Sequence, residues 1–156
     1  LVVGGHNETY HTGPIQWIPL SLGSYYNVGL TGMMVNGERM KGSLGTAMVD
    51  SGTTYTYMAS APYHSLRSAI ERHCASHSSC NAKNTGGNCW QILNASIGVS
   101  RFPNIDVLFG SVASVWVPRA YLYRKNKSEL YCYAFADDGK RANTVLGASW
   151  MLHKEI

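Results

Sequence analysis

The sequence has 156 residues, of which 45% are hydrophobic and 14% are charged, so it is a globular chain long enough for one domain with a core. The net charge of +4 comes from scattered basic residues, and even the densest run, at 124–127, is typical of a solvated loop, which disfavours a nucleic-acid partner. No apolar run reaches the ~18 residues that a membrane-spanning helix needs.

Most of the predicted elements are short strands separated by turn residues. Residues 15–20 and 25–30 alternate between apolar and polar side chains, and residues 33–35 lead into Asn36-Gly37, a pair that favours a hairpin because both residues tolerate positive φ. Residues 46–49 form a strand that stops at Asp50. Further strands are predicted at 105–109, 115–117 and 131–135, followed by a hairpin turn at 137–139 and the apolar pair Val145-Leu146 before Gly147.

A single helix is predicted after the Asp50 segment. Ser60 can cap it, Pro62 suits its first turn, and apolar residues follow at helical spacing from Tyr63 to Cys74. Residues 74–88 are polar and rich in glycine, which predicts a loop. The fold class is therefore mainly β with one or two short helices.

The cysteines and the glycosylation sequons point to one compartment. Four cysteines are present without a Cys-x-x-Cys pair, which disfavours a zinc site and predicts two disulfides. The six histidines show no metal-ligand spacing either. Sequons begin at Asn7, Asn94 and Asn126. Together these features predict a glycoprotein of the secretory pathway, either secreted or in the lumen of an endomembrane compartment.

The segment from Ala47 to Thr54 carries the candidate chemistry. Apolar strand residues lead directly into Asp50, and a carboxylate at the end of a buried strand is costly unless it accepts hydrogen bonds. Gly52 lets the backbone fold back so that its N–H reaches one oxygen, and Thr53 can donate its hydroxyl to the other. Such a carboxylate would stay ionised and fixed, as a general base requires. Taken alone, Asp-Ser-Gly is as well explained by a turn cap.

The wider context resembles the pepsin-like family of aspartic proteases along nearly the whole chain. The resemblance implies one lobe of the bilobal acid-protease fold, with residues 1–156 as a C-terminal lobe cut at both ends. The Asp-Ser-Gly-Thr-Thr form and the extra cysteines resemble the nepenthesin and plasmepsin V groups. The matching segments are 1–5, Tyr10, Gly13, 15–20, 25–28, 35–37, 49–54, the Tyr63 helix, Cys89-Trp90, 102–105, Val117-Pro118, Tyr121, Tyr131-Cys132 and 145–147.

The resemblance implies a role for each residue of the motif. Asp50 is one of two catalytic aspartates that activate a water against a peptide bond, and no cofactor or metal takes part. Ser51 locks the loop to the other lobe, and Thr54 and Tyr25 contact the substrate. Gly52, Thr53 and Gly147 support the catalytic loop. The implied disulfides are Cys89–Cys132 and, by local pairing, Cys74–Cys80, although other pairings stay open.

The implied partners are a polypeptide substrate and an N-terminal lobe that supplies the second aspartate. Asp106 and Asp137 do not resemble a second catalytic loop, so the chain alone is expected to be inactive. Two alternatives remain: a homodimeric retropepsin-like protease with one motif per chain, and a non-catalytic pepsin-fold binding or inhibitor protein.

Overall fold

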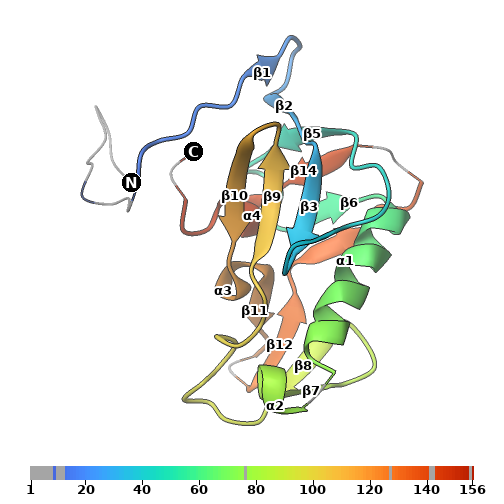
Figure 1. The fold of residues 1–156 in the computed structure, drawn as a ribbon, viewed down its shortest axis with the longest axis vertical. Coiled ribbons are helices and arrows are strands. Elements are labelled where there is room, and N and C mark those ends of the chain that lie inside the picture. The colour runs from blue at the N-terminus through green and yellow to red at the C-terminus, as the bar shows by residue number, and fades with distance from the viewer. Residues whose placement is uncertain (1–8, 10–12, 76, 127, 141–142, 155) are drawn as a thin grey trace.

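The chain folds into three β-sheets with one long helix packed beside them (Figure 1). The structure is a computed structural model that describes residues 9, 13–75, 77–126, 128–140, 143–154 and 156. Within these residues the helices are α1 (Ser60–His73), α2 (His77–Cys80), α3 (Pro118–Tyr121) and α4 (Ala148–Met151). The prediction of a mainly β fold is confirmed. None of the described helices is long and apolar enough to cross a membrane.

The six-stranded sheet A is formed from segments far apart in the chain. Its order is β1-β2-β5-β14-β6-β13, so β14 lies between β5 and β6. β14 is parallel to β5 and pairs Leu146 with Val49, which brings the residues that follow both strands to the same edge. The strands are β1 (Leu20–Ser21), β2 (Asn27–Gly29), β5 (Thr46–Val49), β6 (Thr56–Met58), β13 (Phe135–Asp137) and β14 (Thr144–Leu146).

The four-stranded sheet B crosses in front of sheet A in Figure 1. The predicted hairpin at Asn36-Gly37 is confirmed, because β3 and β4 pair across it and both turn residues have positive φ (51° and 78°). Alternate residues of β9 are buried, as expected for a strand with one face on the core. The strands are β10 (Val112–Trp116), β9 (Ile105–Phe109), β3 (Gly32–Val35) and β4 (Glu38–Arg39), in sheet order.

The four-stranded sheet C lies at the opposite end of the molecule from β1 and β2 (Figure 1). The two middle strands, β12 and β8, are joined by the disulfide Cys89–Cys132, and a second disulfide links Cys74 to Cys80 after α1. These are the two pairings that the family resemblance implies. The strands are β11 (Leu122–Arg124), β12 (Leu130–Tyr133), β8 (Cys89–Ile92) and β7 (Ala82–Asn84), in sheet order.

Helix α1 buries Tyr63, Leu66 and Ile70 in the core that it shares with the sheets. Its predicted cap is wrong, because the N-cap is Ala59 and makes no side-chain hydrogen bond. The hydroxyl of Ser60 instead donates to the Asp137 carboxylate over 2.7 Å, across 77 residues of sequence.

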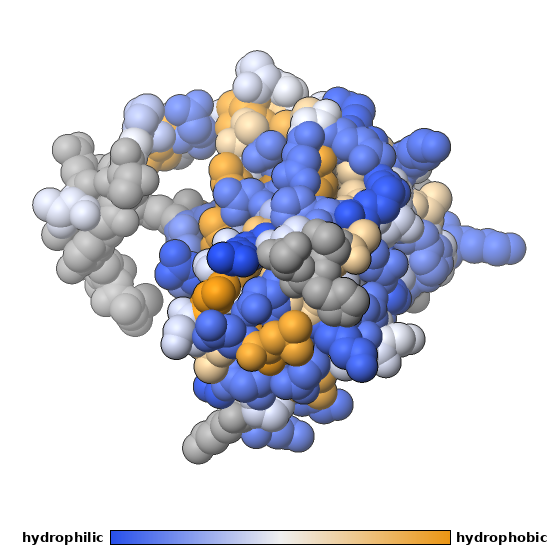
Figure 2. Space-filling model, turned by 60° about the horizontal axis from the view of Figure 1, so that its bottom comes forward, coloured by the Kyte–Doolittle hydropathy of each residue, from blue (hydrophilic) through white to orange (hydrophobic). Residues whose placement is uncertain are grey.

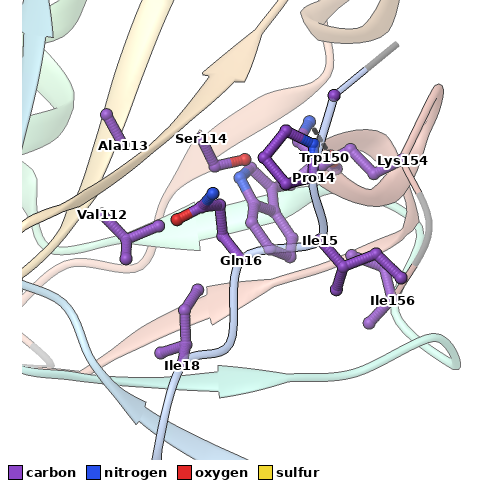
Figure 3. A pocket seen from close by; sticks show the side chains of 11 residues that line it. Pro14, Ile15, Gln16, Ile18, Val112, Ala113, Ser114, Trp150, Lys154 and Ile156 are labelled. Carbon is purple, nitrogen blue, oxygen red and sulfur yellow. Dashed lines mark hydrogen bonds between the residues drawn. The ribbon is translucent and has the colours of Figure 1, made fainter. Parts of the chain in front are cut away.

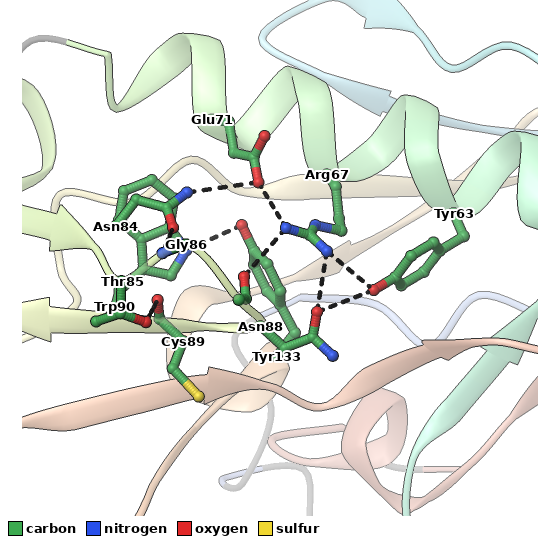
Figure 4. Close-up of polar contacts among 11 residues, drawn as sticks. Tyr63, Arg67, Glu71, Asn84, Thr85, Gly86, Asn88, Cys89, Trp90 and Tyr133 are labelled. Atoms are coloured by element: carbon green, nitrogen blue, oxygen red, sulfur yellow. Dashed lines mark hydrogen bonds and ion pairs between the residues drawn. The ribbon is translucent and has the colours of Figure 1, made fainter.

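A polar cluster holds the other face of α1 to the loop before β8 (Figure 4). The Arg67 guanidinium donates to Asn88 Oδ1 and Glu71 Oε1, both over 2.9 Å, and to the Gly87 carbonyl over 3.1 Å. It also lies over the rings of Tyr63 and Tyr133, at 5.8 and 5.6 Å from their centroids. These contacts give the guanidinium a structural role between helix and sheet.

Four other predictions of local structure are also wrong. Of residues 15–20, only Leu20 lies in a strand, since no neighbouring strand pairs with the rest. The stretch predicted as a loop, 74–88, contains α2 and β7. Their residues are mostly polar, so no regular spacing of apolar side chains indicated a helix or a strand. The predicted strand 131–135 is two strands in different sheets, β12 and β13. Residues 137–139 do not form a hairpin, because β13 and β14 lie on either side of β6.

Candidate functional site

The Asp50 side chain is held by the two residues predicted to hold it. β5 ends at Val49, and the chain turns so that the Gly52 N–H donates to Asp50 Oδ1 over 2.9 Å. The Thr53 hydroxyl donates to Asp50 Oδ2 over 2.6 Å. A Cβ on residue 52 would lie 3.2 Å from Asp50 Oδ1, so glycine allows this approach of backbone to carboxylate. Both carboxylate oxygens are thereby fixed.

These hydrogen bonds also set the charge of the acid. The hydroxyl of Thr53, and after it the N–H of Gly52, hold the pKa of Asp50 below its usual value of 3.8, against a smaller opposing effect of burial. Hydrogen bonds to the charged form of an acid stabilise that form. Asp50 is therefore an ionised carboxylate with a fixed orientation at neutral pH.

The acid loop, residues 50–54, packs against the end of β14 and the segment that follows it. Gly147 passes so close to the loop that a Cβ there would lie 2.1 Å from the Tyr55 carbonyl oxygen and 2.6 Å from that of Thr53. The next residue, Ala148, donates its N–H to the Thr53 carbonyl over 2.7 Å. Before the glycine, Leu146 accepts from the Asp50 N–H over 3.1 Å. Gly147 and its two neighbours therefore lie directly against the acid loop.

The other predicted site residues lie in the acid loop or beside it. Ser51 and Thr54 are exposed on either side of the Gly52–Thr53 pair. The N–H of Val49 donates to the Tyr26 carbonyl over 2.9 Å, which places Tyr25 at the same end of β5 as Asp50. The Tyr25 side chain is 68% exposed. The structure thus brings these residues together on one open edge of sheet A.

The remaining aspartates that the sequence raised lie elsewhere. Asp106 is within β9, paired with Met34 on one side and Val115 on the other. Asp137 ends β13 and accepts hydrogen bonds from Ser60 and from the Gly139 N–H. Among the residues that the structure describes, no group of three or more His, Cys, Asp or Glu side chains could hold a metal ion.

Comparison with known proteins identifies the family of the chain. The family model described as "Xylanase inhibitor C-terminal" matches residues 25–156. The chain belongs to this family of pepsin-like C-terminal domains. Pepsin-2B of Gadus morhua is 30% identical over 78% of the chain and 34% of its own length, and Pepsin A of Sus scrofa is 24% identical over 97% of the chain and 36% of its own length. An aspartic protease of Phaffia rhodozyma is 34% identical over 45% of the chain and 17% of its own length.

The chain therefore spans about a third of the length of each of these two pepsins. The recognition of a pepsin-like C-terminal lobe is confirmed. The finer likeness to the nepenthesin and plasmepsin V groups stays a prediction.

One supporting residue of this lobe was missed from the sequence. Ser149 is buried, its N–H donates to the Thr54 carbonyl over 3.0 Å, and its hydroxyl lies 3.2 Å from the Thr56 hydroxyl. Its own carbonyl accepts from the Trp116 indole N–H over 2.9 Å. Ser149 thus ties the acid loop to the aromatic core, and nothing in the local run Gly-Ala-Ser-Trp indicates this.

A separate cavity of about 230 Å³ lies between residues 13–18, strand β10 and the chain after α4 (Figure 3). The buried Trp150 indole N–H has no hydrogen-bond partner among the residues that the structure describes. Lys154 donates to the Trp150 carbonyl over 2.6 Å, and burial lowers the pKa of its ammonium group to about 8. None of the acid-loop residues lines this cavity.

Proposed function

We propose that this chain is the C-terminal lobe of an aspartic endopeptidase and that Asp50 is one of its two catalytic carboxylates. The observation that carries the proposal is the double anchoring of Asp50, by the Gly52 N–H at 2.9 Å and the Thr53 hydroxyl at 2.6 Å. An acid that merely caps a turn does not need a second strand threaded against its loop. Here Gly147 lies so close to that loop that a Cβ on residue 147 would clash with the Thr53 carbonyl oxygen.

The proposed reaction uses one water and two carboxylates. An N-terminal lobe supplies the second aspartate opposite Asp50. The pair shares one proton, because two carboxyl groups at close range cannot both readily become negatively charged. One acid takes a proton from the water while the other protonates the peptide carbonyl, so no covalent intermediate with the enzyme forms. The exposed hydroxyl of Ser51 is available to the facing lobe, and Thr54 and Tyr25 are available to the substrate.

An apolar surface near the acid loop supports a facing lobe as partner. The arm of residues 13–26 exposes large apolar side chains, among them Trp17 at 86% and Leu20 at 58%. Exposed large apolar side chains gathered in one segment are typical of an interaction site. We assign the arm to contact with the N-terminal lobe, because it leads directly into β2 beside Asp50.

The test of this function is a pair of aspartate substitutions in the full-length protein. Asp50→Asn is expected to lower kcat for peptide hydrolysis by at least ~10²-fold, while Asp138→Asn, at a half-buried aspartate outside the acid loop, should leave it unchanged. The isolated chain should show no turnover. Full activity in Asp50→Asn, or turnover by the isolated chain that Asp50→Ala abolishes, would show that the two-lobe assignment is wrong.

The matched family's description favours a second candidate, a non-catalytic inhibitor. In that case the full-length protein would bind a xylanase and inhibit it, and Asp50→Asn would change neither this inhibition nor any peptide hydrolysis. The homodimeric alternative makes a different prediction, since the isolated chain would sediment as a dimer and cleave peptides on its own.

We also propose that the protein acts in the secretory pathway. Two disulfides in 156 residues are expected in an oxidising compartment and are unusual in the cytosol.

A further inference from the structure

Two of the three sequons lie on neighbouring strand ends of sheet C. Asn94 follows β8 by two residues, and Asn126 lies in the turn between β11 and β12. Because β12 is antiparallel to β8, the end of β8 and the start of β12 meet, and the Ile92 N–H donates to the Glu129 carbonyl over 2.9 Å. Adjacent strands are about 4.8 Å apart, so the two sequons share one end of the sheet.

Both asparagines present a side chain that can carry a sugar after folding. Each is exposed. Asn94 uses its Oδ1 to accept the Ser96 N–H over 2.9 Å, which leaves its Nδ2 as the atom that takes the sugar. Asn126 has a φ of 52° in a turn that the Lys125 N–H closes by donating to the Leu130 carbonyl over 2.8 Å.

Two asparagines whose side chains hold the fold together are not in sequons. Asn88 accepts from Arg67 and Tyr63 in the polar cluster beside α1. Asn84 accepts the Gly86 N–H over 2.8 Å. Neither is followed by Ser or Thr two residues later. Asn7 lies outside the described residues.

We propose that Asn94 and Asn126 both carry N-linked glycans, which together cover the end of sheet C away from the acid loop. In the transfer, Asn Nδ2 bonds to the anomeric carbon of an oligosaccharide, the bond from that carbon to a lipid pyrophosphate breaks, and the amide proton leaves with the pyrophosphate carrier. This inference rests on the secretory pathway proposed above but not on catalysis by Asp50.

The placement has two physical consequences. Leu93, whose side chain is 57% exposed, lies directly beside Asn94 and would be covered by its glycan. Figure 2 brings the sheet C end forward and shows a mainly hydrophilic surface with small separate hydrophobic areas. The strands next to the acid loop, β1, β2 and β5, lie at the other end in Figure 1, so the glycans would leave the acid loop and the apolar arm open.

Peptide mapping tests both sites. The chain is secreted from a eukaryotic host behind a host leader sequence, so that entry into the pathway does not depend on the protein's own localisation. Glycans are removed by a peptide N-glycosidase in ¹⁸O-water, which marks each occupied asparagine as labelled aspartate. We expect label at both Asn94 and Asn126.

Single substitutions make the result specific. Ser96→Ala and Ser128→Ala should each remove one glycan, Ser96→Thr and Ser128→Thr should keep it, and Asn104→Gln, at an exposed asparagine outside a sequon, should change nothing. An unlabelled Asn94 or Asn126 in the secreted chain would overturn the proposal.

Amide NMR spectra before and after glycan removal test the placement. Shifts should be confined to residues 91–96 and 124–130, and shifts in the acid loop, residues 50–54, would contradict it. Asp50→Asn should leave all of these results unchanged, so a failure here is separate from a failure of the proposed peptidase activity.

Discussion

Replacing Gly147 by alanine tests whether close threading holds the acid loop in place. Gly147 has a φ of −83°, which any residue can adopt, so the need for glycine is purely steric. An added Cβ would lie 2.1 and 2.6 Å from the carbonyl oxygens of Tyr55 and Thr53. Both are backbone atoms, so no side-chain rotation relieves the clash.

The expected loss of stability follows from these contacts. Overpacking of this kind costs about 1–3 kcal/mol. Separation of the segments also weakens the hydrogen bonds from the Ala148 N–H (2.7 Å) and the Ser149 N–H (3.0 Å) to the loop, at about 1 kcal/mol each. We therefore expect Gly147→Ala to lower the free energy of unfolding by about 4 kcal/mol, a large part of the 5–15 kcal/mol typical of a domain.

Urea denaturation followed by circular dichroism measures this loss. The matched control is Gly29→Ala in β2, in the same sheet, where an added Cβ meets nothing within 4 Å. That variant should be unchanged or more stable by up to ~1 kcal/mol. A Gly147→Ala protein within ~0.5 kcal/mol of the parent would refute the steric argument.

Three further predictions follow from the charges and cross-links. Thr53→Val should raise the pKa of Asp50 in an NMR titration. Because that pKa is lowered on folding, the stability it contributes is present above pH 3.8 and is lost as the pH falls below it, and this acid-induced loss should shrink in the variant. Lys154 should titrate near pH 8. Since its folded pKa lies below the unfolded 10.5, the free energy of unfolding should rise between pH 8 and 10.5, and Lys154→Met should remove this rise. Serine replacement of both cysteines should cost ~4 kcal/mol at Cys89–Cys132, with a separation of 43 residues, and ~2 kcal/mol at Cys74–Cys80, with a separation of 6, by thermal denaturation.

The acid loop could be predicted from the sequence because its contacts are local. The two hydrogen bonds to Asp50 come from residues two and three positions further on, so a tetrapeptide contains the whole arrangement. The hairpin at Asn36-Gly37 has the same character, since the turn residues alone set the backbone conformation.

The contacts that hold this loop in the fold were decided by tertiary structure. The order β5-β14-β6 inserts a strand from near the end of the chain between two that are close in sequence. Ser149 reaches Thr56 across 93 residues, and Ser60 turns from its expected cap to Asp137 across 77. A hydrogen bond between distant segments produces no recognisable residue pattern in the sequence, because its geometry exists only after the sheets have paired.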